Sequence, residues 1–343
     1  MKKRLKIAQI GVRHEHAEGK MATMRTMPDE FEIVGVCAES PADRETFGRR
    51  ACYEGLRWMS QEEILNYPGL DAVAVETAMT ELVPTAMRCA ERGLPMHMDK
   101  PGGENLEEFD KLLDLCRKNH VILQMAYMFR GNPAIQFCIE AARKGWFGQI
   151  FEVYTSMSRG RDSQPFRQWL STYRGGGIFD FGSHLVDILI SMLGAPDRIV
   201  SFQQQLDADG LNDNGHAVLL YPKTIATIQT ALQQADGQRS RRLFVSGTNA
   251  TFELCPLEQG YIAYPKFNDT PLSARFFLKE GNESFAAGEH MLTFGPMRDR
   301  YIDQLEDFAA YLRGEKQNPY TLEHEHLVQK TVLAVSGYTE WKK

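Results

Sequence analysis

Short apolar runs alternate with amphipathic segments through the first third of the chain. The runs are rich in Val, Ile, Ala and Met and predict buried strands at 6–10, 32–38, 71–76, 95–98 and 121–127. Between them, helical spacing predicts helices at 83–92 and 105–119. Strands separated by helices of this length form parallel sheets covered on both faces. We therefore expect an α/β fold with an N-terminal, Rossmann-like, doubly wound domain over residues 1–124, whose ligand site lies at the carboxyl ends of its strands.

The pattern changes after residue 125, where most apolar runs alternate with polar residues. These runs predict strands at 150–156, 199–206, 214–221, 224–232, 242–247 and 251–254. Alternation is typical of an antiparallel sheet with one face in water. Four helices are expected around it, at 133–144, 180–193, 298–313 and 322–341. Residues 125–343 thus predict an α+β domain with a large open, mostly antiparallel sheet, suited to substrate binding and oligomerisation.

Composition narrows the classes of protein. The 343 residues carry a net charge of −6, which gives no electrostatic support for binding nucleic acid or a membrane surface. No run of about 18 apolar residues exists, and the first apolar run is too short for a secretory signal, so we expect a cytoplasmic protein. Six cysteines without a C-x-x-C pair predict buried free thiols.

A turn beginning with Gly11 follows the first strand, as in dinucleotide-binding folds. Only the first glycine of the G-x-G-x-x-G fingerprint is present, because Arg13 and His16 occupy the other two places. Arg13 could replace a backbone contact to phosphate with a charged one. We expect Gly11, Arg13 and His14 to contact the cofactor; the alternative is a degenerate domain that no longer binds one.

The end of the second strand carries the residues that should select the cofactor. A carboxylate at Glu39 would accept the ribose hydroxyls and repel a 2′-phosphate, which favours NAD. Ser40 and Arg44 could instead receive that phosphate, which leaves NADP open.

Two His-x-His pairs, at 14–16 and 324–326, have the spacing of metal ligands. Neither has a convincing third ligand near it in sequence, so we interpret both as solvated or loop histidines and expect no metal site.

Two motifs point to chemistry. Lys100, in Met-Asp-Lys-Pro, ends the strand at 95–98, at the sheet edge where a nicotinamide would lie. A lysine there can stabilise a developing alkoxide. Further on, a triple glycine at 175–177 leads into Asp180 and His184, which are spaced i, i+4 and so share a helix face.

The order and spacing of these motifs resemble the glucose–fructose oxidoreductase / inositol dehydrogenase / rhizopine-catabolism (Gfo/Idh/MocA) family over almost the whole chain. The family's G-G-G-x-x-x-D-x-G-x-H-x-x-D segment is matched through Asp187, and its R-x-x-P by Arg130 and Pro133. Asp99 stands where the family usually has Glu. In the family's Thr-Pro-Asn-x-x-His, which lines the cofactor cleft, only Thr77 is retained.

The resemblance implies an NAD(P)-dependent dehydrogenase that moves a hydride to or from a hydroxyl-bearing carbon of a sugar, sugar acid or cyclitol. Lys100, Asp180 and His184 would be catalytic, and Thr77 and Lys100 would also contact the cofactor. A homodimer or homotetramer is implied as well. Two alternatives remain: a redox-neutral enzyme that retains its NAD and processes glycosides, and a non-catalytic sugar or dinucleotide sensor on the same scaffold.

The substrate could be anionic. An arginine-rich stretch before the triple glycine could hold a carboxylate or phosphate, and its aromatic residues could stack on a sugar ring. The stretch contains Arg159, Arg161, Arg167, Trp169, Tyr173 and Arg174. A subunit contact is the alternative for this segment.

Overall fold

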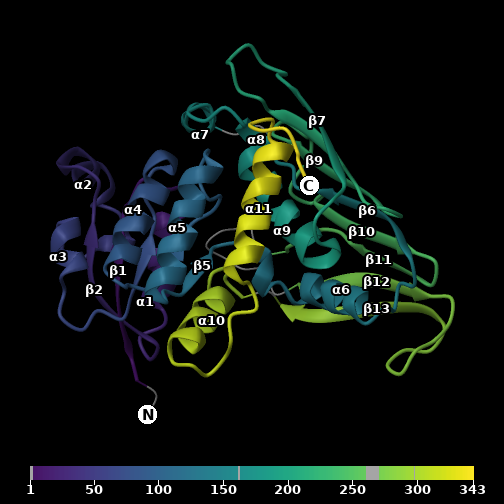
Figure 1. Ribbon diagram of the computed structural model, residues 1–343, viewed down its shortest axis with the longest axis horizontal. Coiled ribbons are helices and arrows are strands. Elements are labelled where there is room, and N and C mark those ends of the chain that lie inside the picture. Colours follow the sequence, from purple (N-terminus) through teal and green to yellow (C-terminus); the bar gives the residue numbers. More distant parts are fainter. Residues whose placement is uncertain (1–2, 161–162, 260–269, 297) are drawn as a thin grey trace. The chain divides into compact units, whose positions relative to one another are not determined.

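The computed structural model describes residues 3–160, 163–259, 270–296 and 298–343. The chain divides into two compact units, each built around its own sheet (Figure 1). Unit 1 comprises Met1–Tyr127 and Tyr301–His326, and unit 2 comprises Met128–Arg300 and Leu327–Lys343.

Unit 1 contains a five-stranded sheet in the order β2-β1-β3-β4-β5, with every pair parallel. The sheet confirms the predicted Rossmann-like, α/β arrangement. The chain passes from β1 to β2 on one side of the sheet and then returns to β3 on the other side of β1. The strand order therefore reverses between β1 and β3, and the carboxyl ends of these two strands lie side by side there. The strands are β1 (Leu5–Ile10), β2 (Phe31–Cys37), β3 (Ala72–Val75), β4 (Met96–Met98) and β5 (Leu123–Met125).

Local sequence signals set the helix starts of unit 1. Ser60 and Glu63 form a capping box, and the Asn105 side chain accepts the backbone N–H groups of Glu107 and Glu108. The helices are α1 (Ala17–Arg25), α2 (Pro41–Phe47), α3 (Gln61–Leu65), α4 (Met79–Glu91) and α5 (Leu106–Asn119).

A late segment of the chain also belongs to unit 1. The sequence boundaries place residues 301–326 in the second domain, but helix α10 (Ile302–Leu312) packs Leu305 and Phe308 into the same core as Ile7 of β1. The centre of the apolar stripe of α10 is buried there, and Ile302 and Leu312 pack against the same core while partly buried. This packing explains why the segment joins this unit rather than the neighbouring one. The unit boundary then falls within α11 (Leu322–Val335).

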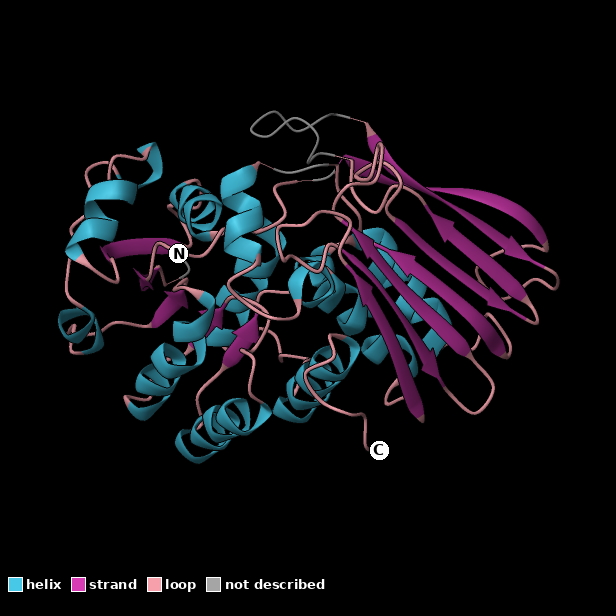
Figure 2. Cartoon of the chain, turned by 90° about the horizontal axis from the view of Figure 1, so that it is seen from above, coloured by secondary structure: helices cyan, strands magenta, loops and turns pink. Residues whose placement is uncertain are grey.

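Unit 2 is dominated by an eight-stranded sheet in the order β13-β12-β11-β10-β6-β9-β8-β7 (Figure 2). All pairs are antiparallel except β6 with β9. The first six strands lie close to their predicted ranges. They are β6 (Ile150–Ser156), β7 (Arg198–Gln204), β8 (Asn214–Leu220), β9 (Ile225–Ala231), β10 (Arg242–Gly247) and β11 (Ala250–Leu254).

Two further strands, β12 (Pro271–Leu278) and the edge strand β13 (Gly288–Pro296), were not predicted. Apolar and polar residues alternate only in part along these two strands, so the pattern alone did not predict them. Contacts between aromatic side chains hold β12 in the sheet. Phe276 of β12 makes edge contacts with Phe137 and Phe285, at ring centroid distances of 5.5 Å.

Helices lie against this sheet: α6 (Pro133–Arg143), α8 (Gly176–Asp180) and α9 (Gly182–Leu193). A further helix, α7 (Gln164–Leu170), contacts α8. The predicted single helix at 180–193 is therefore two, separated at Phe181. In the described part of the chain, no helix is long and apolar enough to cross a membrane. All six cysteines are free, and five are buried as expected, whereas Cys255 is exposed.

Candidate functional site

The turn after β1 brings Gly11 against the end of β3. Gly11 has φ +101°, and a Cβ there would lie 2.4 Å from the backbone nitrogen of Thr77. Only glycine fits this approach and this left-handed backbone. The turn opens onto a cavity of about 390 Å³ at the carboxyl ends of the parallel strands, within the size range of small-ligand sites. The cavity is lined by Ile10, Gly11, Cys37, Ala38, Glu39, Ser60, Gln61, Thr77, Glu81, Thr85 and Arg88.

Glu39 reaches across this turn. Its carboxylate accepts hydrogen bonds from the backbone N–H groups of Val12 at 3.1 Å, Arg13 at 3.3 Å and Ala78 at 3.1 Å. Burial raises the pKa of Glu39, and these hydrogen bonds partly oppose the rise. The residue that the sequence assigns to the ribose therefore also ties the glycine turn to the loop after β3.

The alternative phosphate contacts are already engaged. Ser40 caps α2 by accepting the Asp43 backbone N–H, and the Arg44 guanidinium lies 5.4 Å from the centre of the Trp58 ring. Arg13 points to Asp43 at 3.7 Å and is half-exposed, and it does not line the cavity. The two residues that the sequence offered for a 2′-phosphate, Ser40 and Arg44, are thus occupied by contacts within the protein.

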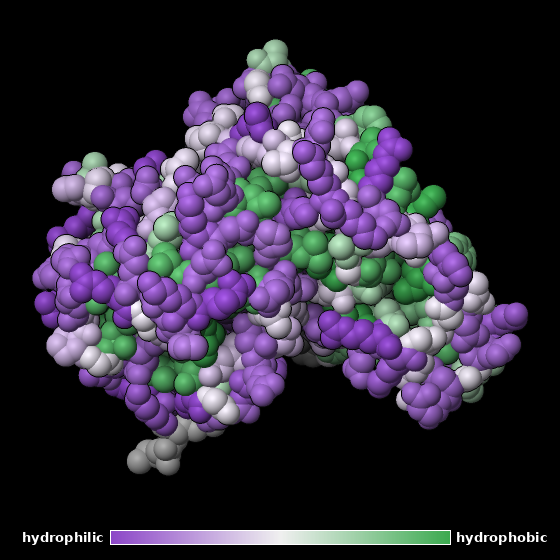
Figure 3. Space-filling model, in the orientation of Figure 1, coloured by the Kyte–Doolittle hydropathy of each residue, from purple (hydrophilic) through white to green (hydrophobic). Residues whose placement is uncertain are grey.

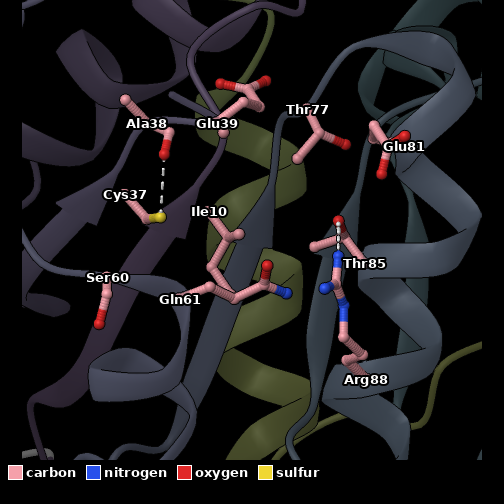
Figure 4. A pocket seen from close by; sticks show the side chains of 11 residues that line it. Ile10, Cys37, Ala38, Glu39, Ser60, Gln61, Thr77, Glu81, Thr85 and Arg88 are labelled. Carbon is pink, nitrogen blue, oxygen red and sulfur yellow. Dashed lines mark hydrogen bonds between the residues drawn. The ribbon is translucent and has the colours of Figure 1, made fainter. Parts of the chain in front are cut away.

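The cavity has polar groups suited to a dinucleotide. In the described part of the chain, the buried hydroxyl oxygen of Thr77 has no hydrogen-bond partner, although it borders the cavity. Figure 4 shows Glu39, Thr77 and Glu81 along one end, and Arg88 at the other. The left-handed Gly11, the Glu39 carboxylate and the Thr77 hydroxyl together fit the adenosine half of a nicotinamide cofactor. Sequence reasoning missed Gln61 and Arg88, whose place at this edge depends on tertiary packing.

A buried charged cluster lies beside the turn. Lys20 of α1 donates to the carboxylates of Glu76, after β3, and Asp99, after β4, the latter at 2.9 Å. Burial alone would lower the pKa of Lys20, but the two carboxylates outweigh it and raise that pKa. Burial likewise acts to raise the pKa of Asp99, yet His14 and Lys20 hold it well below its usual range. The sequence analysis missed this cluster, although two of its residues, Glu76 and Asp99, follow neighbouring strands.

Both histidines of the first His-x-His pair face Asp99. The Nδ1 atom of His14 lies 3.3 Å from Asp99 Oδ2, and that of His16 lies 3.1 Å from Asp99 Oδ1. The interpretation as solvated histidines is wrong for His14, which is only 3% exposed. Burial lowers the pKa of His14 to about 3, so its imidazole is neutral. His14 was predicted to contact the cofactor, but it does not line the cavity.

Lys100 follows directly after Asp99 at the carboxyl end of β4. Its backbone N–H donates to Asp99 Oδ1 at 2.7 Å, and the residue is buried. Its positive charge contributes to the lowered pKa of His14. Lys100 therefore lies at the predicted strand end, next to the buried cluster.

The triple-glycine motif of unit 2 turns into α8 and α9. Gly176 has φ +54°, and a Cβ there would lie 2.4 Å from the carbonyl oxygen of Asn212, so glycine is required. Asp180 ends α8, and His184 lies in the first turn of α9; both are buried. The His184 ring meets the edge of Phe129 at 5.6 Å. The motif thus fixes both side chains on rigid helical backbone.

Two motif residues far apart in the sequence form a buried ion pair. The Arg130 guanidinium donates to Asp187 from both Nε and Nη2, with Nη2 at 2.7 Å from Oδ1. Asp187 lies on α9, one turn after His184. The pair anchors the helix that carries His184.

The arginine-rich stretch is largely engaged within unit 2. Arg167 is buried and donates to Asp209 at 2.7 Å and Asp213 at 3.0 Å, so the expectation that it holds an anionic substrate is wrong. Arg159 stacks on Phe166 at 4.6 Å, and Arg174 on Tyr338 at 4.6 Å. Arg161 lies outside the described residues.

Comparison with known proteins places these features in a family. Residues 5–127 match the profile of an oxidoreductase family with an NAD-binding Rossmann fold, and residues 135–253 match the Gfo/Idh/MocA C-terminal domain. Similar relatives include a D-xylose 1-dehydrogenase (NADP⁺) from Haloferax volcanii, 24% identical over 80% of each chain. A scyllo-inositol 2-dehydrogenase (NAD⁺) from Bacillus subtilis is 29% identical over 40% of each chain.

A solved structure shows the same fold. An oxidoreductase from Thermotoga maritima superposes with a TM-score of 0.78 at 17% identity, covering 97% of this chain and 96% of the other. The two profile matches cover both domains in the family's order. The protein is therefore a member of the Gfo/Idh/MocA family of oxidoreductases, with an NAD-binding Rossmann fold in its N-terminal half.

Proposed function

We propose that this protein is a nicotinamide-dependent dehydrogenase that acts on a hydroxyl-bearing carbon of a sugar, sugar acid or cyclitol. The cavity beside Gly11 is the observation that carries the proposal, because it combines a left-handed glycine turn, a carboxylate and a hydroxyl without a partner at the carboxyl edge of a parallel sheet. The relatives named for xylose and inositol support the substrate class.

Three residues would carry the reaction. His184 accepts the proton of the substrate hydroxyl, since a neutral imidazole is a suitable base near neutral pH. Lys100 stabilises the oxygen as it becomes an alkoxide. Asp180 orients His184 or binds a neighbouring hydroxyl.

The chain's own groups would hold the cofactor. Glu39 binds the ribose hydroxyls, the turn at Gly11 admits the pyrophosphate, and the Thr77 hydroxyl supplies a further hydrogen bond. The nicotinamide accepts or donates the hydride when bound.

A panel of polyols tests the function. The protein is mixed with NAD or NADP and with pentoses, hexoses, uronic acids and inositols, and the nicotinamide absorbance is followed. Reduction with at least one of these compounds is expected. Binding of a sugar without any change in the nicotinamide, together with no conversion of glycosides, would instead favour the non-catalytic sensor.

The free face of the large sheet supports a homodimer or homotetramer. By register, Phe202, Ile225, Phe277 and Met291 belong to the face opposite the buried core residues, and they are 61%, 55%, 38% and 65% exposed. Figure 3 shows apolar residues mixed with hydrophilic ones over unit 2, at the right of the view. A second copy covering this face would remove that apolar surface from water. A monomer mass by light scattering at micromolar concentration would contradict this assembly.

A further inference from the structure

The side chains of His14, His16 and Asp99 converge beside the glycine turn. One potential ligand atom from each lies within 4.8 Å of the other two, and in the described part of the chain no other group of three His, Cys, Asp or Glu side chains meets this spacing. The three come from two separate loops of unit 1, the turn after β1 and the end of β4. Their convergence is therefore produced by the fold and not by sequence proximity.

The spacing fits a metal ion. Zn–N and Zn–O bonds of about 2.0–2.2 Å in a tetrahedral site place neighbouring ligand atoms roughly 3.4 Å apart. The His14 Nδ1 to Asp99 Oδ2 distance is 3.3 Å, and the His16 Nδ1 to Asp99 Oδ1 distance is 3.1 Å. His16 Nδ1 also lies 3.1 Å from Asp99 Oδ2. Both histidines thus stand near the edge length of such a tetrahedron from one carboxylate oxygen, and the three potential ligand atoms all lie within 4.8 Å of one another.

The surroundings orient the carboxylate. Lys20 donates to Asp99 Oδ2 at 2.9 Å, and the Lys100 backbone N–H donates to Oδ1 at 2.7 Å. Each oxygen keeps a further lone pair for a ligand bond, and hydrogen-bonded carboxylates of this kind are usual in metal sites. Glu76 accepts from Lys20 on its other side, which limits the repulsion that the ammonium would exert on a cation.

We propose that His14, His16 and Asp99 bind one divalent transition-metal ion with a preference for imidazole and carboxylate ligands, such as Zn²⁺. Two imidazoles and one carboxylate suit Zn²⁺, Co²⁺, Ni²⁺ and Cu²⁺ better than Mg²⁺ or Ca²⁺, which prefer all-oxygen sites. Three protein ligands leave a position for water or another oxygen ligand. His14 and Asp99 side chains are fully buried, whereas that of His16 is 18% exposed, so the site meets solvent on the His16 side.

Metal binding is measured on the full chain without a polyhistidine tag, after treatment with a chelator. Zn²⁺ is titrated by calorimetry, and Co²⁺ by its visible absorption. We expect about one equivalent to bind, with a higher unfolding temperature at saturating metal because the ion binds the folded state.

His16→Ala removes the most exposed ligand and is the variant least expected to perturb folding. It should weaken Zn²⁺ binding by at least about 100-fold, the upper end of the loss caused by removing a partner that only supports a ligand. Asp99→Asn provides the second test, with its fold checked by circular dichroism. The matched control is His324→Ala/His326→Ala, which removes the other His-x-His pair and should leave Zn²⁺ binding unchanged.

The proposal is overturned if the wild-type chain binds no stoichiometric metal, or if His16→Ala binds Zn²⁺ as tightly as the wild type. Loss of binding in the His324→Ala/His326→Ala control would also overturn it, because the metal would then belong to α11. If the three side chains form only a hydrogen-bonded His–Asp–His cluster, the wild-type chain will bind no stoichiometric metal.

Discussion

The Glu39 carboxylate accepts the backbone N–H of Val12 at 3.1 Å, so the acidic residue after β2 holds the glycine turn. A carboxylate in this place leaves no room for an added phosphate charge, and Ser40 and Arg44 are engaged elsewhere. The protein should therefore bind NAD more tightly than NADP. Calorimetry with both dinucleotides tests this, and a clear preference for NADP would contradict it.

The raised pKa of Glu39 predicts how stability depends on pH. Because burial disfavours the ionised carboxylate, the folded chain keeps this proton to a higher pH than the unfolded chain, whose glutamate titrates near about 4.3. The contribution of Glu39 to stability should thus be largest below that pH and should fall as the pH rises through the folded-state pKa. Urea unfolding of wild type and Glu39→Gln between about pH 4 and pH 7 measures it. A difference between the two proteins that grows in favour of wild type as the pH rises would refute this account.

The buried pair of Arg130 and Asp187 predicts a large loss of stability. Asp187→Ala removes the carboxylate that faces the buried guanidinium, which should cost about 3–5 kcal/mol in the free energy of unfolding. Replacing both by apolar residues, Arg130→Met/Asp187→Leu, should cost less. Glu253→Ala is the control, because its pair with Arg242 is partly exposed and should be worth at most about 1 kcal/mol. Equal losses of unfolding free energy in Asp187→Ala and Glu253→Ala would contradict this prediction, because the buried pair would then contribute no more than the exposed one.

The thiols should differ sharply in reactivity. Burial raises the pKa of Cys37 to about 11 and of Cys89 to about 12, so these side chains stay protonated and shielded. Cys255 is exposed. In native protein a thiol reagent should modify one of six cysteines rapidly, and Cys255→Ser should abolish that fast phase. Rapid modification of two or more thiols would contradict this prediction, because it would show that buried cysteines are readily exposed to the reagent.

Much of this fold follows from local pattern. The parallel strands of unit 1 are short, mostly apolar runs, and local capping sequences at Ser60 and Asn105 begin two of its helices. The family motifs place Lys100 at a strand end and His184 on a buried helix. In these places local propensity and tertiary packing agree, which is why the sequence alone suffices.

Other features depend on distant partners. From the sequence, Lys20 is expected to be a surface residue. Its burial on α1 is possible because the carboxylates of Glu76 and Asp99, which follow two strands, accept its hydrogen bonds. Arg167 reads as a substrate contact until Asp209 and Asp213, about forty residues further on, neutralise it. Asp99 is the third member of the histidine cluster, but it lies 83 residues beyond His16. Such contacts cannot be predicted without the fold, because they join segments that are far apart in the sequence.

The central claim is that Lys100 and His184 carry hydride transfer to or from a polyol. Single-turnover transfer, followed by nicotinamide absorbance, tests it with the best compound of the polyol panel. Lys100→Ala and His184→Ala should each slow the step by about 10²–10⁴. NAD affinity should change little, because neither residue is expected to hold the adenosine half of the cofactor. The control variants Lys118→Ala and His324→Ala should match wild type. If Lys100→Ala and His184→Ala both transfer hydride at near wild-type rates, the catalytic assignment is contradicted.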